Sequence, residues 1–236
     1  MNKKLYDFIL NKQHHQYRNP VAWNLAELYS AKKLSPIERM ADRFEKLCHA
    51  ENPIILEGEQ IVFLRTVSNL PDIFTAEEWA EIKAKHYIHE LGFMSNLSPN
   101  YYDTIAVGLL KKKETADTYG KRAIDNIIKL SDKYLEAAKK QGRADLVEVL
   151  TQVPRYPARS FREALQFFRI LHYALWLEGN YHNTIGRFDK YMYPYLKADM
   201  EKGIHTKETA LDLLEDFFLS FNKDSDAEIA KLKKTM

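Results

Sequence analysis

The sequence predicts a mainly α-helical protein with a few β-strands, and three observations support this prediction. Several segments repeat apolar residues at intervals of three and four, which is typical of helices with one buried face. Three of these segments start with a capping box, in which serine or threonine precedes glutamate by three residues: Ser35–Glu38, Thr75–Glu78 and Ser160–Glu163. The run 55–67, by contrast, is rich in β-branched and apolar residues around Gly58, which predicts one or two strands.

The first fifty residues predict short helical pieces followed by one longer helix. Residues 5–30 break at Asn19–Pro20, and a short helix that carries Trp23 is expected after the proline. The capped helix that begins at Pro36 is expected to end at about Ala50. Its apolar positions follow the spacing of one buried face: Ile37, Met40, Ala41, Phe44, Leu47 and Cys48.

The helix that follows Thr75 carries two histidines, His86 and His89, next to Glu90. Histidines on one helix face are frequent metal ligands, but their order here matches neither helix signature of the zinc proteases. A metal site and a plain amphipathic helix therefore both remain open interpretations.

The central part of the chain predicts further helices in succession. Serine and proline open one at 98–110, and a long helical pair follows at 116–149 with a break at Gln141–Gly142. Two prolines make residues 153–159 an extended linker, because each disfavours helix in the residue before it. The next helix, Phe161–Leu177, is apolar nearly all round, which predicts burial on most sides.

Near the carboxyl end, Thr206 can cap a last helix with apolar residues along one side: Ala210, Leu211, Leu214, Phe217, Phe218 and Phe221. We expect one incomplete domain over residues 1–236, in four parts: helical 1–152, linker 153–159, core helices with a Gly-Arg-Phe-Asp element 160–226, and a charged tail 227–236.

Composition excludes several classes of protein. At 236 residues, with 45% hydrophobic residues, the chain can bury a substantial core. Its net charge of +2 is too small to indicate a nucleic-acid partner, and no run is long and apolar enough to predict a membrane helix. A single cysteine, Cys48, excludes a disulfide framework and agrees with a cytoplasmic protein. A buried cysteine is more often a small hydrophobe than a nucleophile.

One stretch, Trp176–Pro194, combines acids, bases, amides and a guanidinium just where a long apolar helix ends. Its polar residues are Glu178, Asn180, Tyr181, His182, Asn183, Arg187 and Asp189. No phosphate-binding loop, dinucleotide-binding turn or nucleophile elbow occurs elsewhere in the sequence. If the chain contains a functional site, this stretch is therefore the strongest candidate.

Three stretches of sequence carry a resemblance to a known family. They are ILEGEQIV at 55–62, LSPNYYDTIAVGLL at 97–110, and RSFREALQFFRILHYALWLEGNYHNTIGRFDKYMYPYLKAD at 159–199. From about Pro36 to Asp226 the chain resembles the pyruvate formate-lyase-like glycyl radical enzymes. The combination of a buried helix with G-R-x-D and Y-x-Y-P is far more specific than any single glycine or histidine.

This resemblance implies an α/β barrel surrounded by helices, of which the chain forms the amino-terminal part. In the family, a radical S-adenosylmethionine activase installs a glycyl radical near the carboxyl end. That radical oxidises a cysteine at the barrel centre, and the resulting thiyl radical attacks a small-molecule substrate.

The cysteine loop and the glycine loop of the family both follow the region represented here. Cys48 lies far upstream of the catalytic position, and none of the eight glycines lies in such a loop. We therefore expect no bound cofactor and no turnover by this chain alone. An incomplete barrel exposes apolar surface and sheet edges, which predicts association with a complementary carboxyl-terminal half or with a second copy.

Carried over position by position, the resemblance implies that Tyr181, His182 and Asn183 face a substrate pocket. It makes Asp189 a polar or charge-matching group, while Arg187 orients the local backbone. The alternative is a helix terminus whose carbonyls are satisfied by Asn180 and Asn183, with Arg187–Asp189 as a local ion pair.

Two functions follow from these interpretations. The first is the amino-terminal part of a glycyl radical enzyme, which cleaves C–C or C–X bonds when complete. The second is a self-contained helical module that binds a small molecule or another protein.

Overall fold

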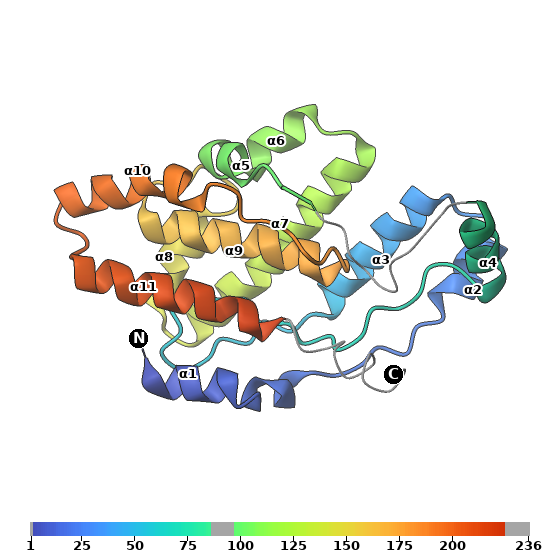
Figure 1. The fold of residues 1–236 in the computed structure, drawn as a ribbon, viewed down its shortest axis with the longest axis horizontal. Coiled ribbons are helices and arrows are strands. Elements are labelled where there is room, and N and C mark those ends of the chain that lie inside the picture. The colour runs from blue at the N-terminus through green and yellow to red at the C-terminus, as the bar shows by residue number, and fades with distance from the viewer. Residues whose placement is uncertain (1, 86–96, 225–236) are drawn as a thin grey trace.

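The computed structural model describes residues 2–85 and 97–224, and these residues are mainly helical (Figure 1). The first helices are α1 Lys3–Leu10, α2 Leu25–Ala31, α3 Pro36–Ala50 and α4 Ala76–Lys85. The central helices are α5 Tyr101–Val107, α6 Leu109–Thr115, α7 Thr118–Lys140 and α8 Ala144–Gln152. The last are α9 Phe161–Leu177, α10 Phe188–Glu201 and α11 Lys207–Ser220. Short 3₁₀ turns occupy Gln13–Tyr17 and Phe221–Lys223.

The capping signals locate the helices well. Helix α3 has the expected bounds, with the capping box of Ser35 and Glu38 in place. Helix α9 starts after Ser160, whose hydroxyl accepts the Glu163 N–H at 3.2 Å, and α11 starts after Thr206. The long pair α7 and α8 breaks at Gln141–Gly142 as predicted, where Gly142 has a φ of 67° that favours glycine.

The strands predicted for 55–67 are not formed. Within the described residues this segment contains no ladder, and its one β-contact is an isolated parallel bridge between Asn19 and Val67. The segment is nonetheless extended and buried, and Val62, Phe63 and Leu64 are fully inaccessible. The β-like composition therefore reports burial of an extended chain rather than pairing with a neighbouring strand.

Side chains from the surrounding helices take the place of a strand partner. The N–H groups of Gln60, Val62 and Leu64 donate to Asp216 Oδ2 at 2.7 Å, Gln166 Oε1 at 2.9 Å and the Tyr134 hydroxyl at 2.9 Å. The N–H groups of Thr66 and Val67 donate to the buried carboxylate of Glu51 at 2.7 and 3.1 Å. Every second amide of 60–66 is thus satisfied without a strand ladder.

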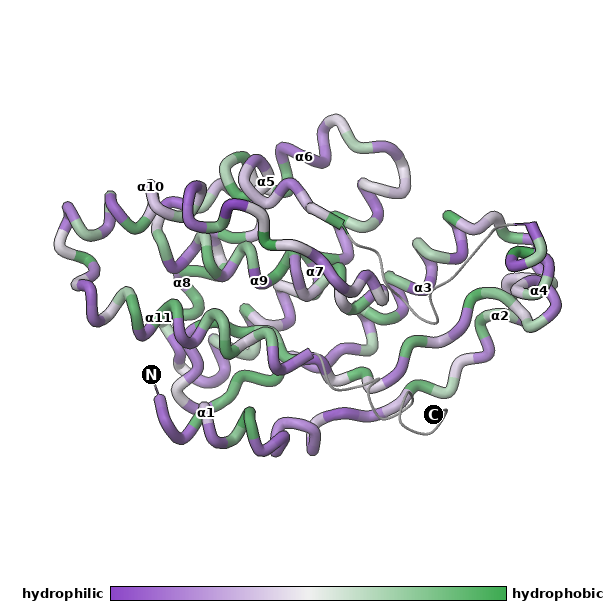
Figure 2. Tube along the Cα trace, viewed as in Figure 1, coloured by the Kyte–Doolittle hydropathy of each residue, from purple (hydrophilic) through white to green (hydrophobic). Residues whose placement is uncertain are grey.

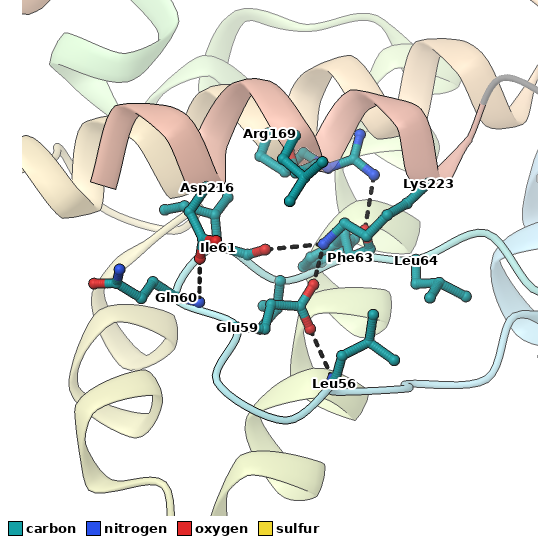
Figure 3. Close-up of polar contacts among 12 residues, drawn as sticks. Leu56, Glu59, Gln60, Ile61, Phe63, Leu64, Arg169, Asp216 and Lys223 are labelled. Atoms are coloured by element: carbon teal, nitrogen blue, oxygen red, sulfur yellow. Dashed lines mark hydrogen bonds and ion pairs between the residues drawn. The ribbon is translucent and has the colours of Figure 1, made fainter. Parts of the chain in front are cut away.

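Buried charged residues fix the same segment to α9 and to the turn that follows α11; Figure 3 shows the contacts of Lys223 with Glu59 and of Arg169 with Phe63. Lys223 pairs with Glu59 and also donates to the Ile61 carbonyl at 3.0 Å. Arg169 pairs with Asp224 and donates to the Phe63 carbonyl at 2.7 Å. All four charged side chains are at most 2% exposed. Each pair must therefore offset the free-energy cost of removing its two charges from water.

Helix α9 lies at the centre of the packing, with α8, α10 and α11 beside it and α7 behind (Figure 1). Phe161, Phe167 and Phe168 of α9 are at most 1% exposed, as its apolar sequence predicts. Phe168 stacks on Tyr101 of α5 at 4.0 Å and meets Phe217 of α11 edge to face at 5.4 Å. Figure 2 shows hydrophobic and hydrophilic residues alternating along the helices around it, as helices with one buried side require.

Two helix predictions need correction, and one helix was missed. The short helix expected to carry Trp23 begins only at Leu25. The single helix expected over 98–110 is two helices, α5 and α6, which meet at Gly108 with a φ of 83°. A Cβ at Gly108 would lie 2.6 Å from the Arg155 carbonyl, so the close approach of the 153–159 linker requires glycine there. Helix α10 was not predicted, because Pro194 lies inside it; the spacing of Phe188, Tyr191, Met192 and Tyr195 is the signal that reveals it.

The apolar faces of α3 and α11 are wider than the core that covers them. Phe44 and Leu47 of α3 are buried, but Ile37 and Met40 are 48% and 44% exposed. On α11, Leu211 and Phe218 are also exposed. No described helix is long and apolar enough to cross a membrane. The predicted tail 227–236 lies outside the described residues.

Candidate functional site

The candidate site is the loop between α9 and α10, which turns at two glycines. Gly179 and Gly186 have φ values of 86° and 61°, which favour glycine. At the end of α9, the N–H groups of Gly179 and Asn180 donate to the carbonyls of Trp176 at 3.1 Å and Leu175 at 2.9 Å. The loop therefore leaves the helix through a hydrogen-bonded turn that places residues 181–183 beyond the helix end.

Tyr181 is the predicted site residue with the best-defined surroundings. Its hydroxyl accepts a hydrogen bond from Arg65 Nη1 at 3.3 Å, and its ring lies 4.7 Å from the Trp176 ring. Arg65 is 1% exposed and also donates from Nε to the Val67 carbonyl at 2.9 Å. Sequence reasoning did not find Arg65; the signal was an arginine in the middle of an otherwise apolar run.

His182 and Asn183 follow Tyr181 but differ from each other in environment. His182 is exposed and has a φ of 61°, a left-handed conformation that is uncommon for a residue with a Cβ. Backbone strain of this kind concentrates at functional sites. Asn183 is half-buried, and its Nδ2 donates to the Asn180 carbonyl at 2.5 Å. The Asn180 carbonyl lies beyond the end of α9 at Leu177, so this contact stabilises the loop, whereas the last carbonyls of the helix accept backbone N–H groups.

Arg187 and Asp189 form a local, exposed ion pair. Arg187 Nε and Nη2 donate to the two carboxylate oxygens at 3.0 and 2.8 Å, and both side chains are more than two-thirds exposed. The pair fixes the start of α10, where the pKa of Asp189 is lowered by the hydrogen bond from Arg187. This arrangement is the local ion pair that the sequence analysis gave as the alternative to a substrate contact. A role of either residue in binding substrate remains a prediction.

Glu178 ends α9 and forms a buried ion pair with Arg43 of α3. Arg43 Nη2 and Nε donate to Glu178 Oε1 at 2.6 and 3.1 Å, and Arg43 Nη1 donates to the Pro71 carbonyl at 3.0 Å. Burial raises the pKa of Glu178 to about 7, although the positive charge of Arg43 opposes this shift. Arg43, an arginine on the buried face of α3, is a second residue that sequence reasoning missed.

His172 lies one turn before this loop, within the aromatic cluster of α9. Its Nδ1 is 3.2 Å from the Tyr101 hydroxyl, and its ring centroid is 4.7 Å from that of Phe221. Burial lowers the pKa of His172 to about 4, and the charge of Arg169 acts in the same direction. The neutral, hydrogen-bonded histidine agrees with a structural role.

The shifted pKa of His172 predicts acid sensitivity. The pKa of His172 in the folded state lies below its unfolded-state pKa of about 6.5. The stability that neutral His172 contributes is therefore complete above pH 6.5 and is lost as the pH falls towards 4. Between pH 7 and pH 5 this amounts to about 2 kcal/mol of unfolding free energy. Urea unfolding measures the free energy of unfolding of wild type and His172→Gln at pH 7 and pH 5. The difference between the two proteins should be smaller at pH 5 by that amount. If the stability of both proteins changed equally between pH 7 and pH 5, the lowered pKa of His172 would be contradicted.

Other candidate chemistry finds no support in the described residues. Cys48 is 2% exposed, and burial raises the pKa of its thiol well above its ordinary range, so it behaves as a core residue. Within residues 2–85 and 97–224 there is no group of three metal-binding side chains. His86, His89 and Glu90, the metal ligands considered from sequence, lie outside the described residues.

Comparison with known proteins decides the family. The pyruvate formate lyase-like family profile matches residues 107–234, more than half of the chain and including α7 to α11 with the whole candidate loop. The chain belongs to the pyruvate formate lyase-like family. The matched range of this family member continues past Asp226, where the resemblance read from the sequence ended.

Curated relatives of this family member are glycyl radical enzymes with different substrates. The 4-hydroxyphenylacetate decarboxylase glycyl radical subunit of Clostridioides difficile is 40% identical over 89 residues, which are 35% of this chain and 10% of that protein. Isethionate sulfite-lyase of Bilophila wadsworthia is 33% identical over 114 residues, 48% of this chain and 14% of that protein. The aligned part is thus a small share of each relative.

Solved structures of larger enzymes contain the same fold. A structure concerned with 1,2-propanediol dehydration in Roseburia inulinivorans superposes with a TM-score of 0.71 at 22% identity, covering 96% of this chain and 38% of that one. Hydroxyproline dehydratase of Clostridioides difficile gives a TM-score of 0.62 at 17% identity, covering 94% and 40%. This pyruvate formate lyase-like chain therefore spans about two-fifths of those structures.

Proposed function

We propose that this chain supplies the amino-terminal part of a cytoplasmic glycyl radical enzyme, a lyase or dehydratase that cleaves a C–C or C–X bond in a small-molecule substrate. The observation that carries the proposal is the family match across α7 to α11, together with a fold shared over nearly the whole chain. The thiyl cysteine and the radical glycine come from a complementary carboxyl-terminal portion. An activating enzyme of the radical S-adenosylmethionine type installs the radical there.

In this proposal the loop after α9 forms one wall of the substrate pocket. Tyr181 is held by Arg65, and its hydroxyl and ring offer a directed polar group on an apolar surface. The strained, exposed His182 presents its imidazole outward from the loop, and Asn183 holds the turn through the Asn180 carbonyl. Arg187 and Asp189 fix the start of α10 and so set the far end of this wall.

The chain alone is inactive in this proposal, since a radical relay needs donor, carrier and substrate within contact distance in a closed site. The described residues supply Cys48, buried in the core, and no second thiol. The exposed apolar residues on α3 and α11 favour association with the complementary portion or with a second copy. Gel filtration should give an assembly larger than 27.7 kDa; a compact monomer that binds no hydrophobic dye would contradict association.

Substitution of the loop tests its assignment to the pocket. In the enzyme assembled with its complementary portion, His182→Ala should lower kcat/KM by about 10- to 100-fold, because a hydrogen bond to substrate is lost in a site shielded from water. Lys197→Gln, which breaks the exposed ion pair with Glu201 further along α10 and outside the proposed wall, is the control and should change kcat/KM less than about threefold. Turnover is measured under anaerobic conditions, and normal activity of His182→Ala would remove this residue from the proposed wall.

A further inference from the structure

The candidate loop begins at a buried ion pair between α9 and α3. Arg43 Nη2 and Nε donate to Glu178 Oε1 at 2.6 and 3.1 Å, and the two side chains are 5% and 10% exposed. Arg43 lies in the middle of α3, and its Nη1 also donates to the Pro71 carbonyl at 3.0 Å. This second contact holds the guanidinium in place, so Glu178 is the partner that can move with the loop.

The chain directly after Glu178 is held by local hydrogen bonds. The N–H groups of residues 179–181 donate to carbonyls no more than five residues before them, at 2.9 to 3.1 Å. Gly179 has a φ of 86°, a conformation in which glycine lets the chain turn away from the helix. Local bonds of this kind do not fix the loop relative to α3. The Arg43–Glu178 pair therefore sets the position of the start of the loop.

The pair leaves the Glu178 carboxylate only half satisfied. Both side-chain hydrogen bonds from Arg43 go to Oε1, whereas Oε2 is buried and has no hydrogen-bond partner among the described residues. A buried charge with unmet hydrogen bonds is costly, and a proton removes the charge while Oε1 still accepts from Arg43. Opening of the loop returns the carboxylate to water. The closed loop thus favours protonated Glu178, and the open loop favours the ionised form.

The pKa of Glu178 agrees with this preference. Burial raises it from its ordinary value of 4.5 to about 7, although Arg43 acts in the opposite direction. The other titratable groups that interact with Glu178 are the Tyr29 hydroxyl of α2 and the Cys48 thiol of α3, and burial raises the pKa of both. Both groups are therefore neutral at pH 7. Among the described residues, Glu178 is thus the member of this cluster whose charge changes near neutral pH.

We propose that Glu178 and Arg43 form a pH-dependent latch, which holds the candidate loop closed against α3 when Glu178 is protonated and lets the loop open more often when Glu178 is ionised. Only the start of the loop moves, while α9 stays folded. The latch follows from the contacts of Glu178 and does not depend on the role of the loop. Its consequence for catalysis, a pocket wall that closes more firmly at low pH, rests on the proposed function.

Hydrogen exchange of the chain tests the proposal at the amides of residues 179–181, which are hydrogen-bonded in the closed loop. Protection factors, which are corrected for the intrinsic pH dependence of exchange, give the equilibrium constant for opening. Because the closed state binds the proton more tightly, this constant should rise about 10- to 30-fold from pH 5.5 to pH 7.5. The amide of Phe168, in the core of α9, should stay more protected at both pH values.

Two substitutions identify the group that titrates. Glu178→Gln keeps an oxygen that accepts from Arg43 but cannot ionise, so the opening constant of residues 179–181 should change less than about twofold over this pH range. Glu45→Gln is the matched control. It also removes the carboxylate of a glutamate–arginine pair on α3, but Glu45 and its partner Arg122 are 29% and 38% exposed. It should leave the wild-type pH dependence unchanged.

Circular dichroism and thermal unfolding establish that each variant is folded, and the wild-type profile decides the direction of the effect without any variant. Opening that is independent of pH, or that low pH favours, would overturn the proposal; charging of His172 would produce the latter result. Wild-type pH dependence in Glu178→Gln would also overturn it, as would exchange of residues 179–181 only together with Phe168. None of these results bears on turnover of the assembled enzyme, which tests the proposed function.

Discussion

Replacing Arg169 with methionine should lower the free energy of unfolding by about 3 to 5 kcal/mol. Arg169 is fully buried on α9, and its guanidinium pairs with Asp224. The guanidinium also donates to the Phe63 carbonyl (Figure 3). The substitution keeps most of the side-chain volume but leaves the Asp224 carboxylate buried without its counter-charge. Urea or guanidinium unfolding at pH 7 measures the change.

Arg187→Met is the matched control for this prediction. It also removes an arginine from an arginine–aspartate pair, but both side chains are more than two-thirds exposed. Exposed pairs contribute little, so the change should stay below about 1 kcal/mol. Equal effects of the two substitutions would show that the cluster of Arg169 and Asp224 does not hold the extended segment against α9.

Replacing Glu51 with alanine should also lower the free energy of unfolding by about 3 to 5 kcal/mol. The Glu51 carboxylate accepts hydrogen bonds from the Thr66 N–H, the Thr66 hydroxyl and the Val67 N–H, and it is 1% exposed. Alanine leaves two buried N–H groups unsatisfied in a segment that has no strand partner. Chemical denaturation at pH 7 measures the loss.

Glu51→Gln distinguishes hydrogen bonding from charge at this position. Glutamine keeps one acceptor oxygen but not the negative charge. Burial raises the pKa of Glu51, whereas the hydrogen bonds from Thr66 and Val67 act in the opposite direction. The loss should therefore be about half of that for alanine. A glutamine variant as unstable as the alanine variant would show that the negative charge, rather than the acceptor geometry, stabilises residues 66–67.

Local signals in the sequence predicted most of the helices. Capping boxes and apolar spacing located α3, α9 and α11, because these features act within a few residues. The run 55–67 was misassigned because its composition reports burial, whereas a strand also needs a partner that composition does not specify. Three of its actual partners, Tyr134, Gln166 and Asp216, lie 70, 104 and 156 residues from the amides that they accept, and Glu51 lies 15 residues from Thr66.

The assignment of the loop after α9 to a substrate site remains a prediction, and the sequence indicated only part of the loop's surroundings. The density of polar residues after α9 indicated the loop, and family resemblance selected Tyr181, His182 and Asn183 within it. Arg65 and Arg43 were missed, since their contacts with Tyr181 and Glu178 join residues 116 and 135 positions apart. Such pairs become visible only when the chain is folded.

Under the proposed function, this chain contributes one wall of the substrate pocket, and the thiyl cysteine and the radical glycine belong to the complementary portion. Electron paramagnetic resonance after anaerobic treatment with the activating enzyme and S-adenosylmethionine shows where the radical forms. The chain alone should give no glycyl radical signal, and the chain combined with a folded complementary portion should give one together with substrate turnover. A glycyl radical on the chain alone, or none in the properly folded pair, would refute this division of roles.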